Sequence, residues 1–178
     1  MRAIRRGHSD AYAQIVERYQ RRLFGLVLMM VKDAGGAEDV VQEAFLRAYT
    51  HLDRFDEQRD FYPWLATIAV RMAQNWMSRR SRVRAREGGS ETEEADAGGT
   101  EDLVAELVAD ERGRQLWRLV GALPQGERMA VLLYYRHDMQ ISDIANALGV
   151  TGGTVKTLLF RGRRKLRTMI TDGEEERA

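Results

Sequence analysis

Apolar side chains recur along this chain at steps of three and four residues, the spacing that places them on one face of a helix. The first such stripe runs from Ile15 to Met30, and Ser9 or Asp10 can provide its N-cap. It predicts a helix that ends near Lys32. Since no long alternation of β-branched residues occurs anywhere in the sequence, we expect an all-α fold.

Two further helices are expected in the first half of the chain. The Gly35-Gly36 pair predicts a break, after which a helix should run from about Ala37 to Leu52. Another should begin between Phe61 and Pro63, because proline is tolerated in the first turn of a helix and not in its interior. It should continue into the arginine cluster that ends at Arg84.

In the second half, apolar periodicity resumes at Leu103 and stops at Leu123-Pro124. Beyond it, Ser142–Leu148 predicts a short helix and Gly149–Gly153 a glycine-containing turn. A longer helix is expected from Thr154 onward. A helix, a tight turn and a second helix form the helix-turn-helix motif, which places its second helix in the major groove of DNA.

Charge divides the chain into blocks that cancel in the total of +1. Residues 1–83 carry a net +4, residues 84–113 a net −7, residues 114–172 a net +6 and residues 173–178 a net −2. Between Glu87 and Thr100 no large apolar residue occurs, so this stretch cannot bury enough surface to become ordered. We therefore expect two small helical domains, 1–84 and 103–172, a flexible acidic linker over 85–102, and an acidic tail over 173–178.

Several classes of function find no support in the sequence. Cysteine is absent, so disulfides and thiolate metal sites are excluded. None of the three histidines follows a carboxylate by three residues, and no phosphate-binding glycine loop or nucleophile elbow occurs. We predict no catalytic residue, no metal and no cofactor. Apolar runs such as Leu26–Val31 are far too short to span a membrane, so a cytoplasmic chain without membrane insertion is expected.

The helix after the glycine turn has two different faces on a helical wheel. Its packed face is predicted to contain Val155, Leu159, Leu166 and Ile170. Its outer face contains Lys156, Thr157, Phe160, Arg161, Arg163, Arg164 and Arg167, preceded by Thr154 in a start of small residues that can approach a phosphate. An aromatic ring among these cations gains nothing from water but suits a thymine methyl group. We expect Lys156 and Arg161 at base edges, and Arg163, Arg164, Lys165 and Arg167 at phosphates.

A second candidate surface lies on the expected helix from Ala37 to Leu52. One face contains Val41, Ala44, Phe45, Ala48, Tyr49 and Leu52, which should pack. The opposite face groups Asp39, Gln42, Glu43 and Leu46. The leucine is either incidental or the apolar centre of a protein-binding patch, and composition alone does not choose between these interpretations.

The segments Ala37–Tyr49, Phe61–Val70, and Leu123-Pro124 with Gly153–Thr157 resemble three regions of bacterial sigma factors, in the family's order. These regions grip the polymerase clamp, melt the promoter and form the C-terminal DNA-binding domain. The resemblance covers about four fifths of the chain, and the missing intermediate domain indicates the extracytoplasmic-function (ECF) group. It implies a non-enzymatic initiation factor that binds core RNA polymerase and promoter DNA and is restrained by an anti-sigma protein.

The resemblance also implies roles for individual residues. Asp39, Gln42, Glu43 and Leu46 would bind polymerase, the helix-turn-helix would read the −35 element, and the loop near Phe55 with the following helix would capture −10 bases. The residues expected at the −10 element are Phe55, Phe61, Tyr62, Trp64, Arg71, Asn75, Arg79 and Arg80, whose rings and cations suit unpaired bases and their backbone. Core spacing predicts that Trp64 is mainly buried and leaves Phe61 and Tyr62 open to either environment.

Two positions depart from the family pattern. Arg71 stands where asparagine is usual, and Leu158 stands where an arginine is usual in the recognition helix. The wheel places Leu158 at the border of the packed face. The leucine in place of arginine should therefore remove one phosphate contact without changing the fold. A conventional helix-turn-helix repressor or activator is the main alternative, and it would explain the second half of the chain alone.

Overall fold

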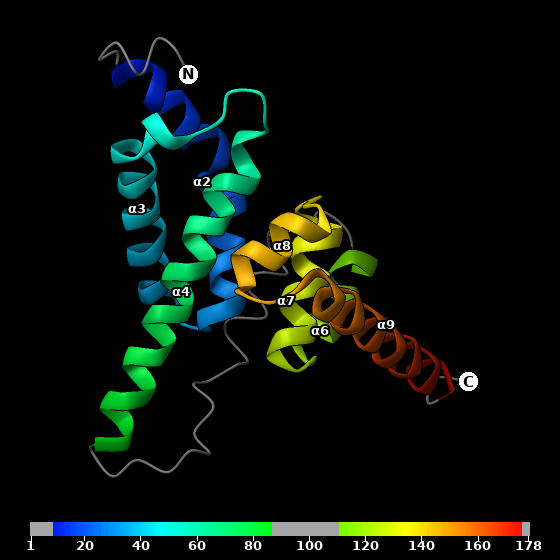
Figure 1. The fold of residues 1–178 in the computed structure, drawn as a ribbon. Helices are drawn as coiled ribbons and strands as arrows, with labels where there is room; N and C mark the ends of the chain where they lie inside the picture. Colours follow the sequence, from blue (N-terminus) through cyan, green and yellow to red (C-terminus); the bar gives the residue numbers. More distant parts are fainter. Residues whose placement is uncertain (1–8, 87–110, 176–178) are drawn as a thin grey trace. The chain divides into compact units, whose positions relative to one another are not determined.

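The computed structural model describes residues 9–86 and 111–175, and no strand occurs within them. The chain divides into two helical units, with the division between residues 97 and 98 (Figure 1). This confirms the predicted all-α class with two small helical domains. The predicted boundaries at 84 and 103 remain predictions, because residues 87–110 lie outside the described residues.

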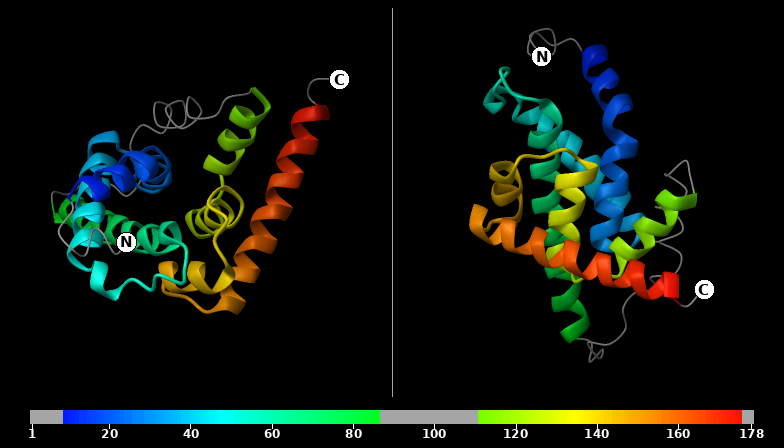
Figure 2. Two further views of the ribbon diagram at one scale, coloured as in Figure 1. Left: turned by 90° about the horizontal axis from the view of Figure 1, so that it is seen from above. Right: turned by 90° about the vertical axis from the view of Figure 1, so that its right-hand side faces the viewer.

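In the first unit, residues 9–86 form three long helices that each contact the other two (Figure 2). They are α2 (Ser9–Val31), α3 (Ala34–Thr50) and α4 (Phe61–Arg86), and a short 3-10 turn, η1 (Leu52–Arg54), follows α3. The core between them is fully apolar at its centre, with Leu23, Leu26 and Val27 from α2, Ala37 and Ala44 from α3, and Leu65, Ala69 and Val70 from α4. Burial of these stripes, and not intrinsic helix propensity, is the main source of stability for such helices.

The predicted break at Gly35-Gly36 is wrong, because both glycines lie in the first turn of α3. The chain turns instead at Lys32, whose φ is 51°, and at the extended Asp33. Asp33 is the N-cap of α3, and its carboxylate accepts a hydrogen bond from the Gly36 N–H at 2.7 Å. The cap satisfies a backbone donor that would otherwise lack a partner, which lets the helix start before the glycines.

The same carboxylate pairs with Arg80 of α4, which also lies over the ring of Trp76 with 4.9 Å between guanidinium carbon and ring centroid. The Arg80 hydrogen bond, followed by the Gly36 N–H, lowers the pKa of Asp33 below its ordinary value of 3.8. A carboxyl with a lowered folded-state pKa stabilises the fold fully above the ordinary pKa, and this stabilisation is lost as the pH falls through the lowered value. Asp33 therefore connects the start of α3 to α4 in its charged form.

Substitutions at Asp33 should separate these two contacts. Asn at this position keeps an N-cap acceptor and loses the charge, whereas Ala loses both. We expect Asp33→Ala to be less stable than Asp33→Asn by about 0.5–2 kcal/mol, the usual contribution of an N-cap. Urea unfolding at neutral pH measures this difference, and equal stability of the two variants would contradict the cap. At neutral pH wild type should be more stable than Asp33→Asn, because only the charged carboxylate pairs with Arg80. When the unfolding is repeated below pH 4, this difference in stability should disappear as Asp33 becomes protonated.

Within residues 111–175, the described part of the second unit, there are four α-helices and a short π-helical turn. They are α6 (Glu111–Gly121), α7 (Gln125–Val131), η2 (Leu132–Arg136), α8 (Ile141–Leu148) and α9 (Gly152–Glu175). The centre of the core is formed by Met129, Leu133, Met139, Ile144, Val155 and Leu159. Arg128 is also buried and donates a hydrogen bond to the carbonyl of Gly121 at 2.9 Å, which caps the end of α6.

The predicted helix-turn-helix is present as α8 and α9. Gly149 has a φ of 68°, the left-handed conformation that favours glycine at the end of a helix, so the predicted glycine turn is confirmed. The second helix begins two residues earlier than expected, because Thr151 accepts the Thr154 N–H at 3.2 Å through its hydroxyl and lets Gly152 and Gly153 enter the first turn.

Other predictions fall partly outside the described residues. The linker was expected from residue 85, but α4 continues to Arg86, and the remainder of the proposed linker is not described. The apolar positions from Leu103 to Val108 and residues 176–178 of the acidic tail are likewise outside, whereas α9 continues into the tail as far as Glu175. None of the helices within residues 9–86 and 111–175 combines the length and the apolar character of a membrane span.

Candidate functional site

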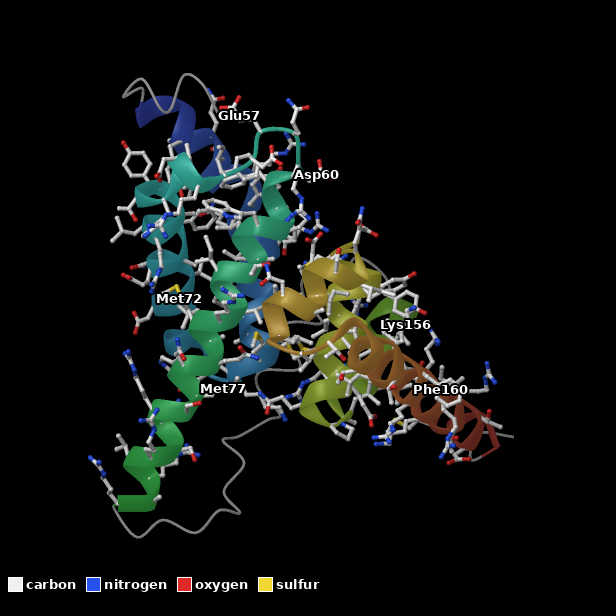
Figure 3. The ribbon with its side chains drawn as sticks, viewed as in Figure 1. Glu57, Asp60, Met72, Met77, Lys156 and Phe160 are labelled. Carbon is white, nitrogen blue, oxygen red and sulfur yellow. The ribbon has the colours of Figure 1, made fainter. Side chains whose placement is uncertain are left out.

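The outer face of α9 is open to solvent along its whole predicted length. Val155 and Leu159 are buried, whereas Phe160, the next residue along the helix, is 59% exposed. Lys156 and Phe160 project from the helix in Figure 3. The predicted set is exposed without exception: Thr154, Lys156, Thr157, Phe160, Arg161, Arg163, Arg164 and Arg167. Cations interleaved with one aromatic ring on a single helical face suit a nucleic-acid surface.

Two cations of α9 have partners within the unit. Arg163 donates a hydrogen bond to the Tyr135 hydroxyl at 3.2 Å, and both residues remain exposed. Lys165 binds the buried carboxylate of Glu127 at 3.0 Å. The expected phosphate contact of Lys165 stays a prediction, and it would compete with this ion pair to α7.

The packed side of α9 agrees with the wheel in most positions. Leu158 is half-buried and lies against Gly126 of α7, where a β-carbon added to the glycine would come within 3.3 Å of a Leu158 methyl. Its predicted place at the border of the packed face is confirmed. Leu166 is half-buried, but Ile170 is exposed, so the prediction that Ile170 packs is wrong.

The acidic face of α3 is also exposed. Leu46 is 58% exposed, and Asp39, Gln42 and Glu43 surround it on the same side of the helix. The opposite side packs as predicted, with one exception: Tyr49 is exposed and its ring lies 4.9 Å from that of Tyr12. Tyr12 was not predicted to matter. Its hydroxyl donates to the carbonyl of Phe45, and burial raises the pKa of Tyr12 to about 12, with a smaller contribution from Tyr49.

Three aromatic residues expected at the −10 element are buried. Phe55, Phe61 and Tyr62 are each at most 7% exposed, and Trp64 keeps only a minor part of its surface exposed, in agreement with the expectation that it is mainly buried. Their rings and Tyr19 of α2 form one cluster with centroids 5.3–6.0 Å apart. Of the two environments left open for Phe61 and Tyr62, the structure shows the buried one, with Tyr19 of α2 against both rings. Phe55 is buried against Phe61 and Trp64 and offers no open ring.

Arg22 of α2 also lies over the Tyr62 ring, at 4.0 Å from its centroid. Beside the aromatic cluster, the loop from Asp56 to Asp60 is exposed, and Glu57 and Asp60 mark it in Figure 3. The Asp56 carboxylate accepts the Gln58 N–H at 3.0 Å and shapes this loop. Its carboxylates were not predicted as site residues, although three acidic residues in five were visible in the sequence.

The predicted cations of α4 separate into two groups. Arg71, Asn75 and Arg79 follow one another at four-residue steps and are all exposed. Arg80 binds Asp33 and covers Trp76, so the structure gives it a role in the fold, and its predicted place on the DNA surface stays a prediction. The last turns of α4 extend beyond α2 and α3 (Figure 1) and carry Arg82, Arg84 and Arg86.

No group of three or more histidine, aspartate or glutamate side chains in the described part of the chain is arranged to hold a metal ion. The exposed predicted site residues lie on three candidate surfaces. They are the outer face of α9, the Leu46 face of α3, and the stripe of α4 from Arg71 to Arg79 beside the acidic loop.

Comparisons with known proteins match both units. The family description "Sigma-70 region 2" matches residues 15–83, and "Sigma-70, region 4" matches residues 113–166. The ECF RNA polymerase sigma factor SigW of Bacillus subtilis is 31% identical over 97% of this chain and 95% of its own. The ECF RNA polymerase sigma-E factor of Escherichia coli K12 is 32% identical over 92% of this chain and 88% of its own.

Solved structures show the same fold at low identity. The sigma factor RpoE of Bartonella quintana, in complex with the anti-sigma factor NepR, matches with a TM-score of 0.71 and 21% identity over 90% of this chain and 97% of that one. CnrH, in complex with the cytosolic domain of CnrY, matches with a TM-score of 0.63 and 24% identity over 95% and 93%. Two family regions that together match most of the chain, and relatives aligned over nearly its full length, show that the chain belongs to the ECF group of RNA polymerase sigma factors.

Proposed function

We propose that this sigma factor binds core RNA polymerase through the Leu46 face of α3 and directs it to promoters through α4 and α9. The observation that carries the proposal is the exposed cationic and aromatic face of α9, which lies on the second helix of a helix-turn-helix. Catalysis would be performed by the polymerase, and this chain would supply binding energy and strand capture.

At the −35 element, α9 enters the major groove. Phe160 lies where its ring can contact a thymine methyl group, Arg161 contacts a base edge, and Arg167 contacts a phosphate. The exposure of all three side chains supports this arrangement. Lys156 and Thr157 belong to the first turns of α9, the part of a recognition helix that reaches base edges.

At the −10 element, the buried rings are supports and not stacking platforms. They pack against Trp64, which keeps a minor part of its surface exposed, and lie beside the loop from Asp56 to Asp60, which is open to solvent. Carboxylates accept hydrogen bonds from the amino groups of cytosine and adenine, so this acidic loop suits the edges of unpaired bases. Arg71, Asn75 and Arg79 then follow the strand along α4.

An anti-sigma protein is the further partner we propose. One structural neighbour, RpoE, was solved with the anti-sigma factor NepR, and another, CnrH, was solved with the cytosolic domain of CnrY. In this chain the exposed apolar residues Leu46 and Phe160 are candidates for coverage by a partner, since large apolar side chains are otherwise left in water.

Reconstitution tests the proposal directly. Core polymerase with this chain should initiate at a defined set of promoters when transcripts are mapped across the genome, and polymerase alone should not. A conventional repressor would instead bind an operator tightly without polymerase and give no new start sites, and that result would overturn the sigma assignment of function.

The division of labour on α9 gives a sharper prediction. Arg161→Ala should change the preferred −35 sequence at one position, with a loss of about 1–3 kcal/mol for the best site. Arg167→Ala should weaken all sequences alike and reduce the salt slope of binding by about 0.9, because one phosphate contact is lost. Selection from a randomised −35 library and salt titration measure the two effects. Identical profiles for the two variants would refute the division.

A further inference from the structure

The second unit holds a buried carboxylate behind its outer DNA-binding face. Glu127 lies in the first turn of α7, and its side chain is only 9% exposed. The ammonium group of Lys165 on α9 lies 3.0 Å from both carboxylate oxygens, and it donates a hydrogen bond to Oε1. Among the described residues, no donor hydrogen-bonds to the buried Oε2. Lys165 is therefore the cation that balances this charge.

The pair lies beside a close contact between α7 and α9. A β-carbon added to Gly162 of α9 would come within 2.9 Å of the Val131 side chain and within 3.6 Å of Glu127. The backbone of α9 thus lies directly against α7 at Gly162. One turn further along α9, Lys165 forms its ion pair with Glu127 of α7. With a close glycine contact and an ion pair on successive turns, α9 has little freedom to rotate about its own axis.

Lys165 is surrounded in the sequence by cations with a different environment. Arg161 and Arg164 are exposed on the outer side of α9, and the Lys165 side chain is itself 44% exposed, but neither arginine forms an ion pair with any residue that the structure describes. A buried carboxylate that loses its cation carries an uncompensated charge, which is far more costly than an exposed one. Lys165 is therefore retained by Glu127 more firmly than a surface pair would retain it.

We infer that Glu127 is a positioning residue for the DNA-binding helix, and that Lys165 belongs to the fold and not to the DNA-binding surface. The inference rests on the proposed contact of α9 with DNA. It assigns two roles to neighbouring cations of the same helix: Arg164 neutralises phosphates, while Lys165 sets the orientation in which Arg161 and Arg164 are presented.

The salt dependence of DNA binding separates these roles. Each phosphate neutralised by the protein contributes about 0.9 to the slope of log K against log salt. Arg164→Gln should reduce the slope by about that amount. Lys165→Gln should keep the slope of wild type and give a parallel line displaced to roughly two- to fivefold weaker binding, the effect of losing one partly exposed pair.

The experiment uses the full chain and a fluorescein-labelled, mixed-sequence DNA duplex, with anisotropy measured over a salt series at a temperature where every variant is folded. Lys165→Arg, which keeps the pair, should coincide with wild type. Urea unfolding should show a lower midpoint for Lys165→Gln and Glu127→Gln and an unchanged one for Arg164→Gln. These results together would support the inference.

If Lys165→Gln reduced the slope of log K against log salt as much as Arg164→Gln does, Lys165 would contact the DNA and the assignment would be overturned. A Lys165→Gln line that coincides with wild type would overturn the positioning role. If Arg164→Gln and Arg167→Gln also left the slope unchanged, α9 would not be the DNA surface, and the proposed function would fail instead. The two failures are therefore distinguishable.

Discussion

Replacement of Gly36 by alanine is expected to be among the most destabilising single-methyl changes available in the first unit. A β-carbon at this position would lie 2.3 Å from the ring of Trp76, far inside van der Waals contact, so the ring must move. The movement would also disturb Arg80, which covers Trp76 and binds Asp33. Overpacking of this kind costs about 1–3 kcal/mol, and loss of the Asp33 contacts would add to it.

The neighbouring glycine provides the matched control. A β-carbon on Gly35 would meet only the Asp33 carboxylate, at 3.7 Å, and would improve the helix by about 0.5–1 kcal/mol. Urea unfolding followed by tryptophan fluorescence in a Trp117→Phe background reports on this unit, since both remaining tryptophans lie in α4. We expect the urea midpoint of Gly35→Ala to be higher than that of wild type and the midpoint of Gly36→Ala to be much lower. Equal midpoints for the two variants would contradict the close contact.

A second variant tests the cause. In a Trp76→Ala background the ring is absent, so Gly36→Ala should no longer lower the urea midpoint and should behave like Gly35→Ala. Failure of this double variant to suppress the effect would mean that the loss arises from the backbone and not from the ring.

The contrast between Gly36 and Gly149 shows what the sequence can reveal about glycine. At Gly149 the local signal was sufficient, because a glycine after a short amphipathic helix predicts a left-handed cap, and the structure has it. At Gly35-Gly36 the same signal predicted a break that does not exist. The competing information lay in Asp33, three residues before Gly36, and in Trp76, which is forty positions away in the sequence and fills the space that a side chain would need.

The fold and the exposed faces could be predicted because helical periodicity is a local property of the sequence. The environment of an individual cation could not. Arg80 and Lys165 look like their neighbours in arginine-rich segments, yet their carboxylate partners are 47 and 38 residues away. The burial of Phe61 and Tyr62 has the same origin, since Tyr19 of α2 covers both rings.

Replacement of Leu46 by aspartate should be the most damaging surface change in the proposed polymerase interface. Leu46 is the apolar centre of a face whose rim is formed by Asp39, Gln42 and Glu43. A carboxylate at the dry centre of an interface would be desolvated and would lie among like charges, both of which oppose binding. Central residues of this kind contribute about 2 kcal/mol or more, so we expect affinity for core polymerase to fall roughly thirtyfold or further. Competition against labelled wild-type chain for core polymerase measures the loss.

Val83 on α4 supplies the control, because it is about as exposed as Leu46, belongs to the same unit and lies outside the proposed polymerase face. Val83→Asp should leave polymerase affinity within about twofold of wild type, as is usual for substitutions outside a binding centre. Both variants should keep the wild-type urea midpoint, since neither side chain is buried, and Leu46→Asp should still bind duplex DNA through α9. An equal loss for the two variants would indicate a general effect of added negative charge. Loss only at Leu46, with the fold and DNA binding intact, would leave the face of α3 as the site of polymerase contact.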